Sequence, residues 1–303
     1  MTEPAVPASP GTPPAEVDLD DRLVRALLRD QHPDLADRPL ALVAGGWDNA
    51  TYRLGDDLAV RLPRRRVAAA LLRKEQEWLP RLAARLPVPV PEPVRVGEPS
   101  AGYPWPWSVV RWIPGRSAEC EELSPGQAEQ FGRFLAALHE PAPDSLPRNE
   151  YRCLTLADVS PRVEQRLRRL STMNTGLAVP LLTVRQRWQQ ALAASPDSLD
   201  TCVHGDLHPK NLVVDAGRLA AVLDWGDLTA GDPAIDLAAA WMLFPVDAHP
   251  AVWESYRPTE PDTVVRAAGW AVYWGVTLLD AGLAGDPPFA EIGRRTLARL
   301  CGD

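Results

Sequence analysis

The chain has 303 residues, of which 46% are hydrophobic and 24% charged, and its formal net charge is −8 at pH 7. This length allows one large domain or two smaller ones with a sizeable buried core. The acidic balance argues against general nucleic-acid binding, which normally shows a basic excess. Only two of the 32 basic residues are lysines, Lys74 and Lys210. A function that commonly needs a lysine must therefore use one of these two or an arginine.

Cysteine spacing and hydropathy indicate in which cellular compartment the protein is found. The four cysteines lie far apart without a CxxC pair, which argues against a zinc site and favours reduced thiols. No apolar run reaches membrane-spanning length, and the Pro- and Ala-rich start of the chain lacks the features of a secretory signal. We expect a cytoplasmic protein without a membrane partner and a disordered tail over residues 1–17. The sequence gives no prediction of the oligomeric state.

The elements predicted first form a β-rich lobe over residues 18–113. A helix is predicted at 18–30, where Leu19, Leu23 and Leu27 recur at helical spacing. A three-stranded antiparallel meander follows, with strands at 40–44, 50–54 and 58–62 separated by turn sequences rich in Gly and Asp. A strong helix is predicted at 68–84, interrupted late by Pro80, and two more strands are predicted at 94–96 and 107–112.

The sequence Ile113-Pro114-Gly115 breaks this pattern and marks a predicted domain boundary, with a largely helical lobe over 114–303. Helices are predicted at 124–139, 163–170, 181–194, 235–243 and 264–281. One β-like patch interrupts them, with strands at 211–214 and 219–223 around a turn. The expected class is α+β, with a β-rich N-terminal lobe before a helical C-terminal lobe. A nucleotide often binds between two such lobes.

The stretch from Thr201 to Ala238 carries the candidate chemistry. Asp206 and Asn211 lie in a loop that ends where a strand begins, and Asp224 ends the next strand across a hairpin turn. Because a hairpin returns the chain to its start, we expect Asp224 to lie beside Asn211. Phosphoryl transfer needs a positioned carboxylate for the acceptor hydroxyl and hard oxygen ligands for Mg²⁺ at the phosphates. This short segment supplies both.

The same stretch resembles a known family. HGDLHPKN at 204–211 matches the kinase catalytic-loop pattern H-x-D-L-x-x-x-N, and DWG at 224–226 takes the place of the kinase metal-binding D-x-G element. With the following DWGDLTAGDPAIDLA, the composite is similar to the aminoglycoside phosphotransferase family, which includes antibiotic-resistance kinases and small-metabolite kinases. The resemblance implies a protein-kinase-like two-lobe fold and an ATP- or GTP-dependent phosphotransferase acting on an alcohol group.

Roles for individual residues come from the matching positions. Asp206 would be the catalytic base, and Asn211 and Asp224 would bind Mg²⁺. The resemblance also implies that the N-terminal lobe binds the nucleotide. Gly46 and Asn49 would lie near the phosphates, and Arg61 takes the position where the family usually has a lysine, with Glu75 as its partner. The segment 107–112, including Arg111, would contact the adenine or guanine base. The resemblance also implies that Asp236 braces the catalytic loop and that His204 orients it.

The acceptor is less constrained by the sequence. An aminoglycoside-type antibiotic is the leading expectation, because the last part of the chain has a mild acidic excess that suits a polycation: Asp247, Glu254, Glu260, Asp262, Asp280, Asp286 and Glu291. A macrolide would need a broader apolar pocket, which four tryptophans can provide: Trp241, Trp253, Trp270 and Trp274. A cellular metabolite kinase and a nucleotide-binding pseudokinase remain as alternatives. A protein kinase is disfavoured, because no room is left for a long activation segment after the DWG element.

Overall fold

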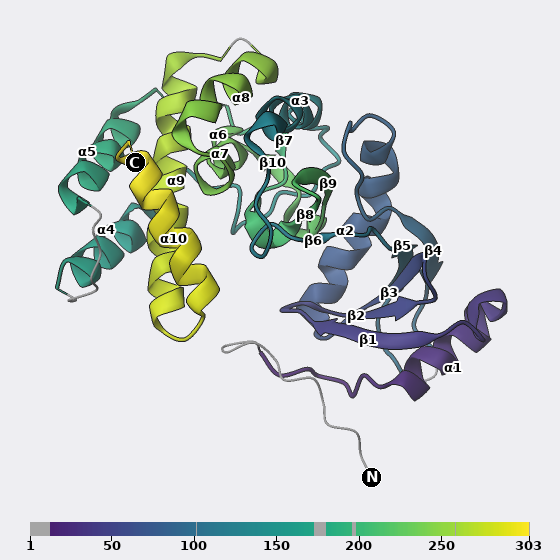
Figure 1. The fold of residues 1–303 in the computed structure, drawn as a ribbon. Helices are drawn as coiled ribbons and strands as arrows, with labels where there is room; N and C mark the ends of the chain where they lie inside the picture. The colour runs from purple at the N-terminus through teal and green to yellow at the C-terminus, as the bar shows by residue number, and fades with distance from the viewer. Residues whose placement is uncertain (1–12, 101, 173–179, 196–197, 258, 303) are drawn as a thin grey trace. The chain divides into compact units, whose positions relative to one another are not determined.

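The computed structural model describes residues 13–100, 102–172, 180–195, 198–257 and 259–302. The chain forms two compact units, each described below by itself (Figure 1). The first comprises Met1–Arg85 and Val90–Pro114, and the second comprises Leu86–Pro89 and Gly115–Asp303. Most of the predicted tail, residues 1–12, lies outside the described residues. Within the rest of it, the Glu16 N–H donates to the carbonyl oxygen of Arg64 at 2.9 Å.

The first unit is built on a five-stranded antiparallel sheet with the order β1-β2-β3-β5-β4. Its strands are β1 (Leu40–Gly45), β2 (Asn49–Leu54), β3 (Leu58–Pro63), β4 (Pro93–Gly97) and β5 (Trp107–Arg111). Burial alternates along β2, as expected for a strand with one face on a core. The predicted meander and the two later strands are confirmed, with register Ala50 opposite Leu62 and Arg61 opposite Ser108.

Two α-helices and a 3₁₀ turn complete the first unit: α1 (Asp21–Gln31), η1 (Pro33–Leu35) and α2 (Arg66–Ala83). The Asp20 carboxylate accepts from the Leu23 N–H at 2.8 Å and thereby caps α1. Pro80 lies inside α2 without ending it, since the helix closes only one turn later. The core between α1 and the sheet includes Leu27, Tyr52 and Trp107, all nearly inaccessible to solvent.

The second unit is mainly helical. Its helices are α3 (Ala128–Leu138), α4 (Leu156–Thr172), α5 (Leu181–Ala193), α6 (Ala234–Leu237), α7 (Ala239–Leu243), α8 (His249–Tyr256), α9 (Pro261–Leu283) and α10 (Pro287–Leu300), with 3₁₀ turns η2 (Pro125–Gln127), η3 (Pro209–Asn211), η4 (Trp225–Asp227) and η5 (Val246–Ala248). Helix α9 packs against α4, α5, α6 and α10. No described helix is long and apolar enough to cross a membrane.

Helix α10 was not predicted from the sequence. Its start, Asp286-Pro287-Pro288, has the composition of a loop, yet proline fits the first helical positions and the Asp286 carboxylate accepts from the Phe289 N–H at 3.4 Å. The helix lies alongside α9 (Figure 1). A Cβ added at Gly282 of α9 would lie 2.0 Å from the Ala290 nitrogen, so the two backbones approach too closely for any larger residue there. The shorter helix α8 was not predicted either.

Two small sheets support the loops of the second unit. One has the order β6-β8-β9, with β6 (Arg116–Ser117), β8 (Leu212–Asp215) and β9 (Arg218–Val222), and it contains the predicted hairpin. The other pairs β7 (Thr201–Val203) with β10 (Thr229–Gly231), placing Val203 opposite Thr229. This second sheet was not predicted, because three-residue strands leave no periodic signal. It anchors both ends of the chain segment that carries the candidate chemistry.

Candidate active site

Asp206 lies in the loop between β7 and η3, and the backbone of this loop is bound by a second aspartate. Asp236 of α6 accepts from the His204 N–H at 2.7 Å and from the Gly205 N–H at 2.9 Å. Gly205 has φ +82°, and a Cβ there would lie 3.1 Å from the Asp227 carbonyl oxygen and 3.3 Å from Arg152 Cβ. Both the left-handed backbone and the close approach require glycine. The loop thus presents Asp206 in one fixed direction.

Asp236 is itself held by a buried polar chain. His139 Nε2 lies 3.2 Å from Asp236 Oδ2, and His139 Nδ1 lies 2.9 Å from the Tyr256 hydroxyl, which accepts from Arg257 Nη2 at 3.0 Å. Burial, the largest influence, raises the pKa of Asp236, but His139, His204 and the Gly205 N–H more than offset it. The net pKa lies below its ordinary value. Asp236 is therefore ionised and bonded to the loop backbone, which fits the bracing role that the family resemblance implies.

His204 connects the catalytic loop to the segment containing Asp224. Its Nδ1 accepts from the Asp206 N–H at 3.3 Å, and its Nε2 lies 3.0 Å from the Leu223 carbonyl oxygen. These two contacts fit a neutral imidazole with its proton on Nε2, because a carbonyl oxygen only accepts. The ring also packs edge-on against Trp225, with centroids 4.8 Å apart. These contacts fit the orienting role that the family resemblance implies for His204.

Asn211 and Asp224 are brought together by the hairpin. The Leu223 N–H donates to the Asn211 carbonyl oxygen at 2.8 Å, so Asp224 follows directly after a residue bonded to Asn211. The Asn211 amide nitrogen donates to the Asp206 carbonyl oxygen at 2.9 Å, which leaves the amide oxygen facing the other way. Asp224 has φ 60° and ψ 67°, an uncommon conformation for a residue with a side chain. Such strain is retained mainly where function needs it.

The donor set fits Mg²⁺. An amide oxygen and a carboxylate are hard oxygen ligands, and Mg²⁺ in nucleotide sites uses one or two carboxylates together with phosphate oxygens. Within the described residues, no group of three or more His, Cys, Asp or Glu is placed to hold a metal ion unaided.

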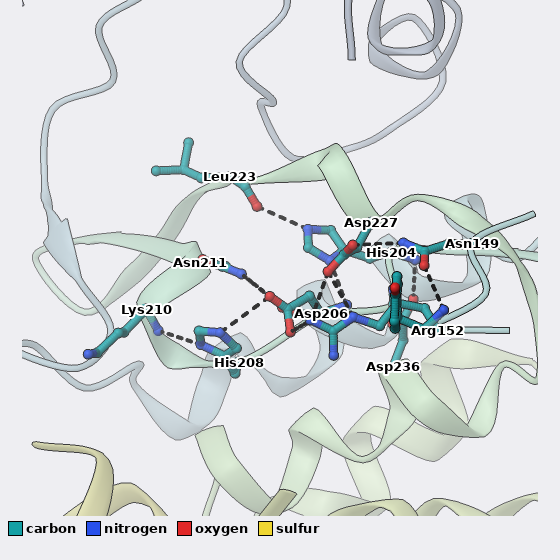
Figure 2. A network of polar contacts seen from close by, with 12 residues as sticks. Asn149, Arg152, His204, Asp206, His208, Lys210, Asn211, Leu223, Asp227 and Asp236 are labelled. Atoms are coloured by element: carbon teal, nitrogen blue, oxygen red, sulfur yellow. Dashed lines mark hydrogen bonds and ion pairs between the residues drawn. The ribbon is translucent and has the colours of Figure 1, made fainter. Parts of the chain in front are cut away.

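The Asp206 side chain is bound by an arginine that the sequence did not reveal. Arg152 Nη2 lies 2.7 Å from Asp206 Oδ1, and His208 Nε2 lies 3.6 Å from Asp206 Oδ2 (Figure 2). Burial, the largest influence, raises the pKa of Asp206, but Arg152 and His208 more than offset it and hold the pKa below its usual range. Asp206 is therefore a carboxylate at neutral pH.

Arg152 also contacts Asp227, so one guanidinium bridges two carboxylates. Its Nε and Nη2 lie 2.8 and 2.7 Å from Asp227 Oδ2, and the Asn149 amide nitrogen donates to Asp227 Oδ1 at 2.8 Å (Figure 2). Arg152 and Asn149 come from the segment before α4, far upstream of the motif. No periodicity or spacing connects that segment to Asp206, and a polar Asn-Glu-Tyr-Arg run in a loop was the only available signal.

The predicted nucleotide-binding residues all lie in the first unit. Arg61 of β3 and Glu75 of α2 form a bidentate ion pair, with Nη1 and Nη2 at 2.5 and 3.4 Å from the two carboxylate oxygens. The Gly46 N–H donates to the Asn49 carbonyl oxygen at 2.9 Å within the turn between β1 and β2. This N–H is therefore engaged by the turn itself. Arg111 ends β5 and is exposed.

A five-stranded sheet with an ion-paired helix, followed by a helical unit carrying Asp206, Asn211 and Asp224, defines a kinase-type phosphotransferase fold. The chain belongs to the phosphotransferase enzyme family, whose sequence model matches residues 39–263. Aminoglycoside 3'-phosphotransferase of Escherichia coli is 27% identical over 165 residues, which cover 52% of this chain and 60% of that protein. The match thus spans less than two-thirds of the length of this curated relative.

Solved structures show the same fold over nearly the whole chain. The GDP complex of aminoglycoside 2'-phosphotransferase-IIIa has a TM-score of 0.64 at 17% identity, covering 94% of this chain and 99% of that chain. The apoenzyme of macrolide 2'-phosphotransferase from Brachybacterium faecium has a TM-score of 0.56 at 23% identity, covering 92% of this chain and 98% of that chain. The predicted kinase-like α+β fold is confirmed.

Proposed function

We propose that this protein transfers the γ-phosphoryl group of ATP or GTP to a hydroxyl group of a small molecule. The observation that carries the proposal is the assembly of Asp206, Asn211 and Asp224 on one loop and hairpin, with Asp236 bound to the loop backbone at 2.7 and 2.9 Å. Family membership and the fold support it. We expect the reaction in the cytoplasm, where nucleoside triphosphates are abundant.

Asp206 is proposed to orient the acceptor hydroxyl and to receive its proton. Because its pKa is lowered, the carboxylate is a weak base, and its main contribution is to align the hydroxyl oxygen with the phosphorus. Proton transfer then occurs late, when the bond to phosphorus has formed and the hydroxyl has become acidic. Mg²⁺, held by Asn211 and Asp224, would supply charge neutralisation at the phosphates.

Arg61 is proposed to bind the nucleotide phosphates in place of the lysine usual in the family. Glu75 fixes its position, since the two side chains are 12% and 4% exposed and bonded at two points. A guanidinium stays charged at any physiological pH and can contact phosphate oxygens in pairs. This arrangement supports an active enzyme over a nucleotide-binding pseudokinase. ATP and GTP are both to be tested as the phosphoryl donor.

An aminoglycoside is the acceptor that the relatives' names favour, and a macrolide is the second. Antibiotic resistance would be the biological role in either case. A cellular metabolite is the third candidate. The charges around Asp206 bear on this choice, because Arg152 already occupies the carboxylates nearest to the acceptor hydroxyl.

The test is release of nucleoside diphosphate from ATP or GTP with Mg²⁺, scanning aminoglycosides, macrolides and small hydroxy metabolites. Asp206→Ala serves as the inactive comparison. Release that an acceptor stimulates and that Asp206→Ala abolishes supports the proposal. Nucleotide binding without stimulated release by any acceptor, unchanged in Arg61→Lys, would instead favour the pseudokinase.

A further inference from the structure

The guanidinium of Arg152 bridges the carboxylates of Asp206 and Asp227. Its Nη2 is 2.7 Å from both Asp206 Oδ1 and Asp227 Oδ2, and its Nε is 2.8 Å from Asp227 Oδ2. The remaining Asp227 oxygen accepts from Asn149. The Arg152 and Asp206 side chains are 21% and 19% exposed, so solvent screens this cluster only in part. An acceptor hydroxyl that reaches Asp206 must therefore approach a fixed positive charge.

Arg152 makes the acceptor side of Asp206 less negative than its two carboxylates alone would make it. A polyamine-like acceptor binds through ammonium groups that need unpaired carboxylates. Asp206 and Asp227 would be the nearest carboxylates, and one guanidinium already binds both. An ammonium group entering there must either displace Arg152 or lie beside it, and the guanidinium repels it while already neutralising one of the two carboxylate charges. A neutral hydroxyl group faces no such obstacle.

The acidic residues near the C-terminus compensate only in part. Four of the seven are engaged within the unit: Asp280 with Arg166 and Arg169, Asp286 with Lys210, Glu291 with Arg294, and Asp262 with the Ser195 N–H. The other three, Asp247, Glu254 and Glu260, are exposed. More than half of the acidic excess that made a polycation attractive from the sequence is thus paired. This observation is independent of the Arg152 contacts.

The side of Arg152 away from the carboxylates is aromatic. Its guanidinium lies 5.4 Å from the centroid of the Trp274 ring, which also packs against Tyr273 at 5.2 Å and against His208 at 6.2 Å. The Trp274 ring is itself buried, at 5% exposure, so this cation–π contact helps to hold the guanidinium in place.

We propose that Arg152 determines acceptor specificity: by occupying both carboxylates, it makes the acceptor side of Asp206 a site for neutral hydroxy compounds and disfavours polycations. This inference rests on the proposed phosphotransferase function and narrows its acceptor class. Arg152, which lies outside the motif, would then discriminate between aminoglycosides, macrolides and cellular metabolites.

The experiment measures binding of kanamycin, a polycation, by calorimetry at low salt. The wild-type protein is expected to bind it with a Kd above about 1 mM. Arg152→Gln, which frees two carboxylates, is expected to bind it at least about tenfold more tightly, or about 1.4 kcal/mol. Arg148→Gln is the matched control, because it removes the same charge from the same segment while Arg148 contacts Asp200 and not Asp206. Its affinity is expected to stay within about twofold of wild type.

Each result decides the proposal. An unchanged or weaker affinity of Arg152→Gln, including no detectable binding to either protein, overturns it. If Arg152→Gln does not fold, the wild-type protein alone decides: micromolar kanamycin binding overturns the proposal and its absence supports it. The proposed function is judged separately by diphosphate release. Turnover of kanamycin by the wild type would retain that function and refute the role of Arg152.

Discussion

Arg61 and Glu75 form a buried ion pair in which both guanidinium ends contact the carboxylate, at 2.5 and 3.4 Å. The pair connects strand β3 to helix α2, so Arg61 makes the contact with Glu75 that the family resemblance predicts. Its geometry makes Arg61 a fixed part of the first unit and fits the proposed contact with nucleotide phosphates.

The Arg61–Glu75 pair should show strong energetic coupling. Arg61→Met and Glu75→Gln each remove one side of a largely buried ion pair and are expected to cost about 3 kcal/mol of unfolding free energy. The double variant should cost clearly less than the sum, by about 2 kcal/mol. Urea denaturation of the four proteins measures this coupling. Additive single effects would show that the two side chains do not interact in solution.

Asp206→Asn should lower kcat by about 10²- to 10⁴-fold, because the amide cannot take the hydroxyl proton. Nucleotide affinity should remain within about twofold, since nucleotide binding is assigned to other residues. Stimulated diphosphate release and nucleotide titration measure the two quantities. An equal loss of kcat and of nucleotide affinity would indicate that the second unit is misfolded, and not that a catalytic group is lost.

Asn211→Ala and Asp224→Ala should raise the Mg²⁺ concentration needed for half-maximal activity by at least about tenfold. Activity should partly return at high Mg²⁺ for Asn211→Ala, which removes the neutral ligand. Lys210→Ala is the neighbouring control, because its ammonium group contacts Glu119 and Asp286. An unchanged Mg²⁺ dependence in both ligand variants would place the ion elsewhere.

Asp236→Asn should destabilise the second unit by about 2 to 4 kcal/mol at pH 7, because the buried carboxylate accepts two backbone bonds and faces His139. The folded-state pKa of Asp236 is lowered, so its stabilisation is complete above the ordinary pKa of 3.8. That stabilisation decreases as the pH falls from 3.8 through the folded-state pKa. Urea denaturation at pH 7, 5 and 3 should show the difference from wild type shrinking at pH 3. Asp215→Asn, at an exposed turn, should show little difference at any pH.

Gly205→Ala should cost about 1 to 2 kcal/mol of stability and lower kcat, because its φ of +82° and the nearby Asp227 carbonyl oxygen both oppose a side chain. Gly126→Ala is the control, since a Cβ there meets nothing within 4 Å. Thermal melting and diphosphate release measure the two effects. Wild-type behaviour of Gly205→Ala would mean that the loop has room to adjust.

Local patterns made much of the fold predictable. Alternation and turn residues predicted β1 to β3, and the loop-and-hairpin spacing predicted that Asn211 and Asp224 meet. The elements that the sequence did not predict have physical causes. Strands β7 and β10 are too short to show periodicity, and helix α10 begins with two prolines. Arg152 could not be predicted, because its contact with Asp206 depends on how distant segments fold together. All the assigned roles in the reaction stay predictions: the base Asp206, the Mg²⁺ ligands Asn211 and Asp224, and the nucleotide-binding residues Gly46, Asn49, Arg61, Glu75 and Arg111.

The position of Arg152 outside the motif has a consequence for sorting relatives. Two homologues can share every motif residue from His204 to Asp236 and still differ at position 152. Chains with arginine there are expected to group by neutral acceptors, and chains with a small or acidic residue there by cationic ones. Position 152, in the loop that precedes α4, is then a better marker for dividing the family into substrate groups than the motif by which its members are found.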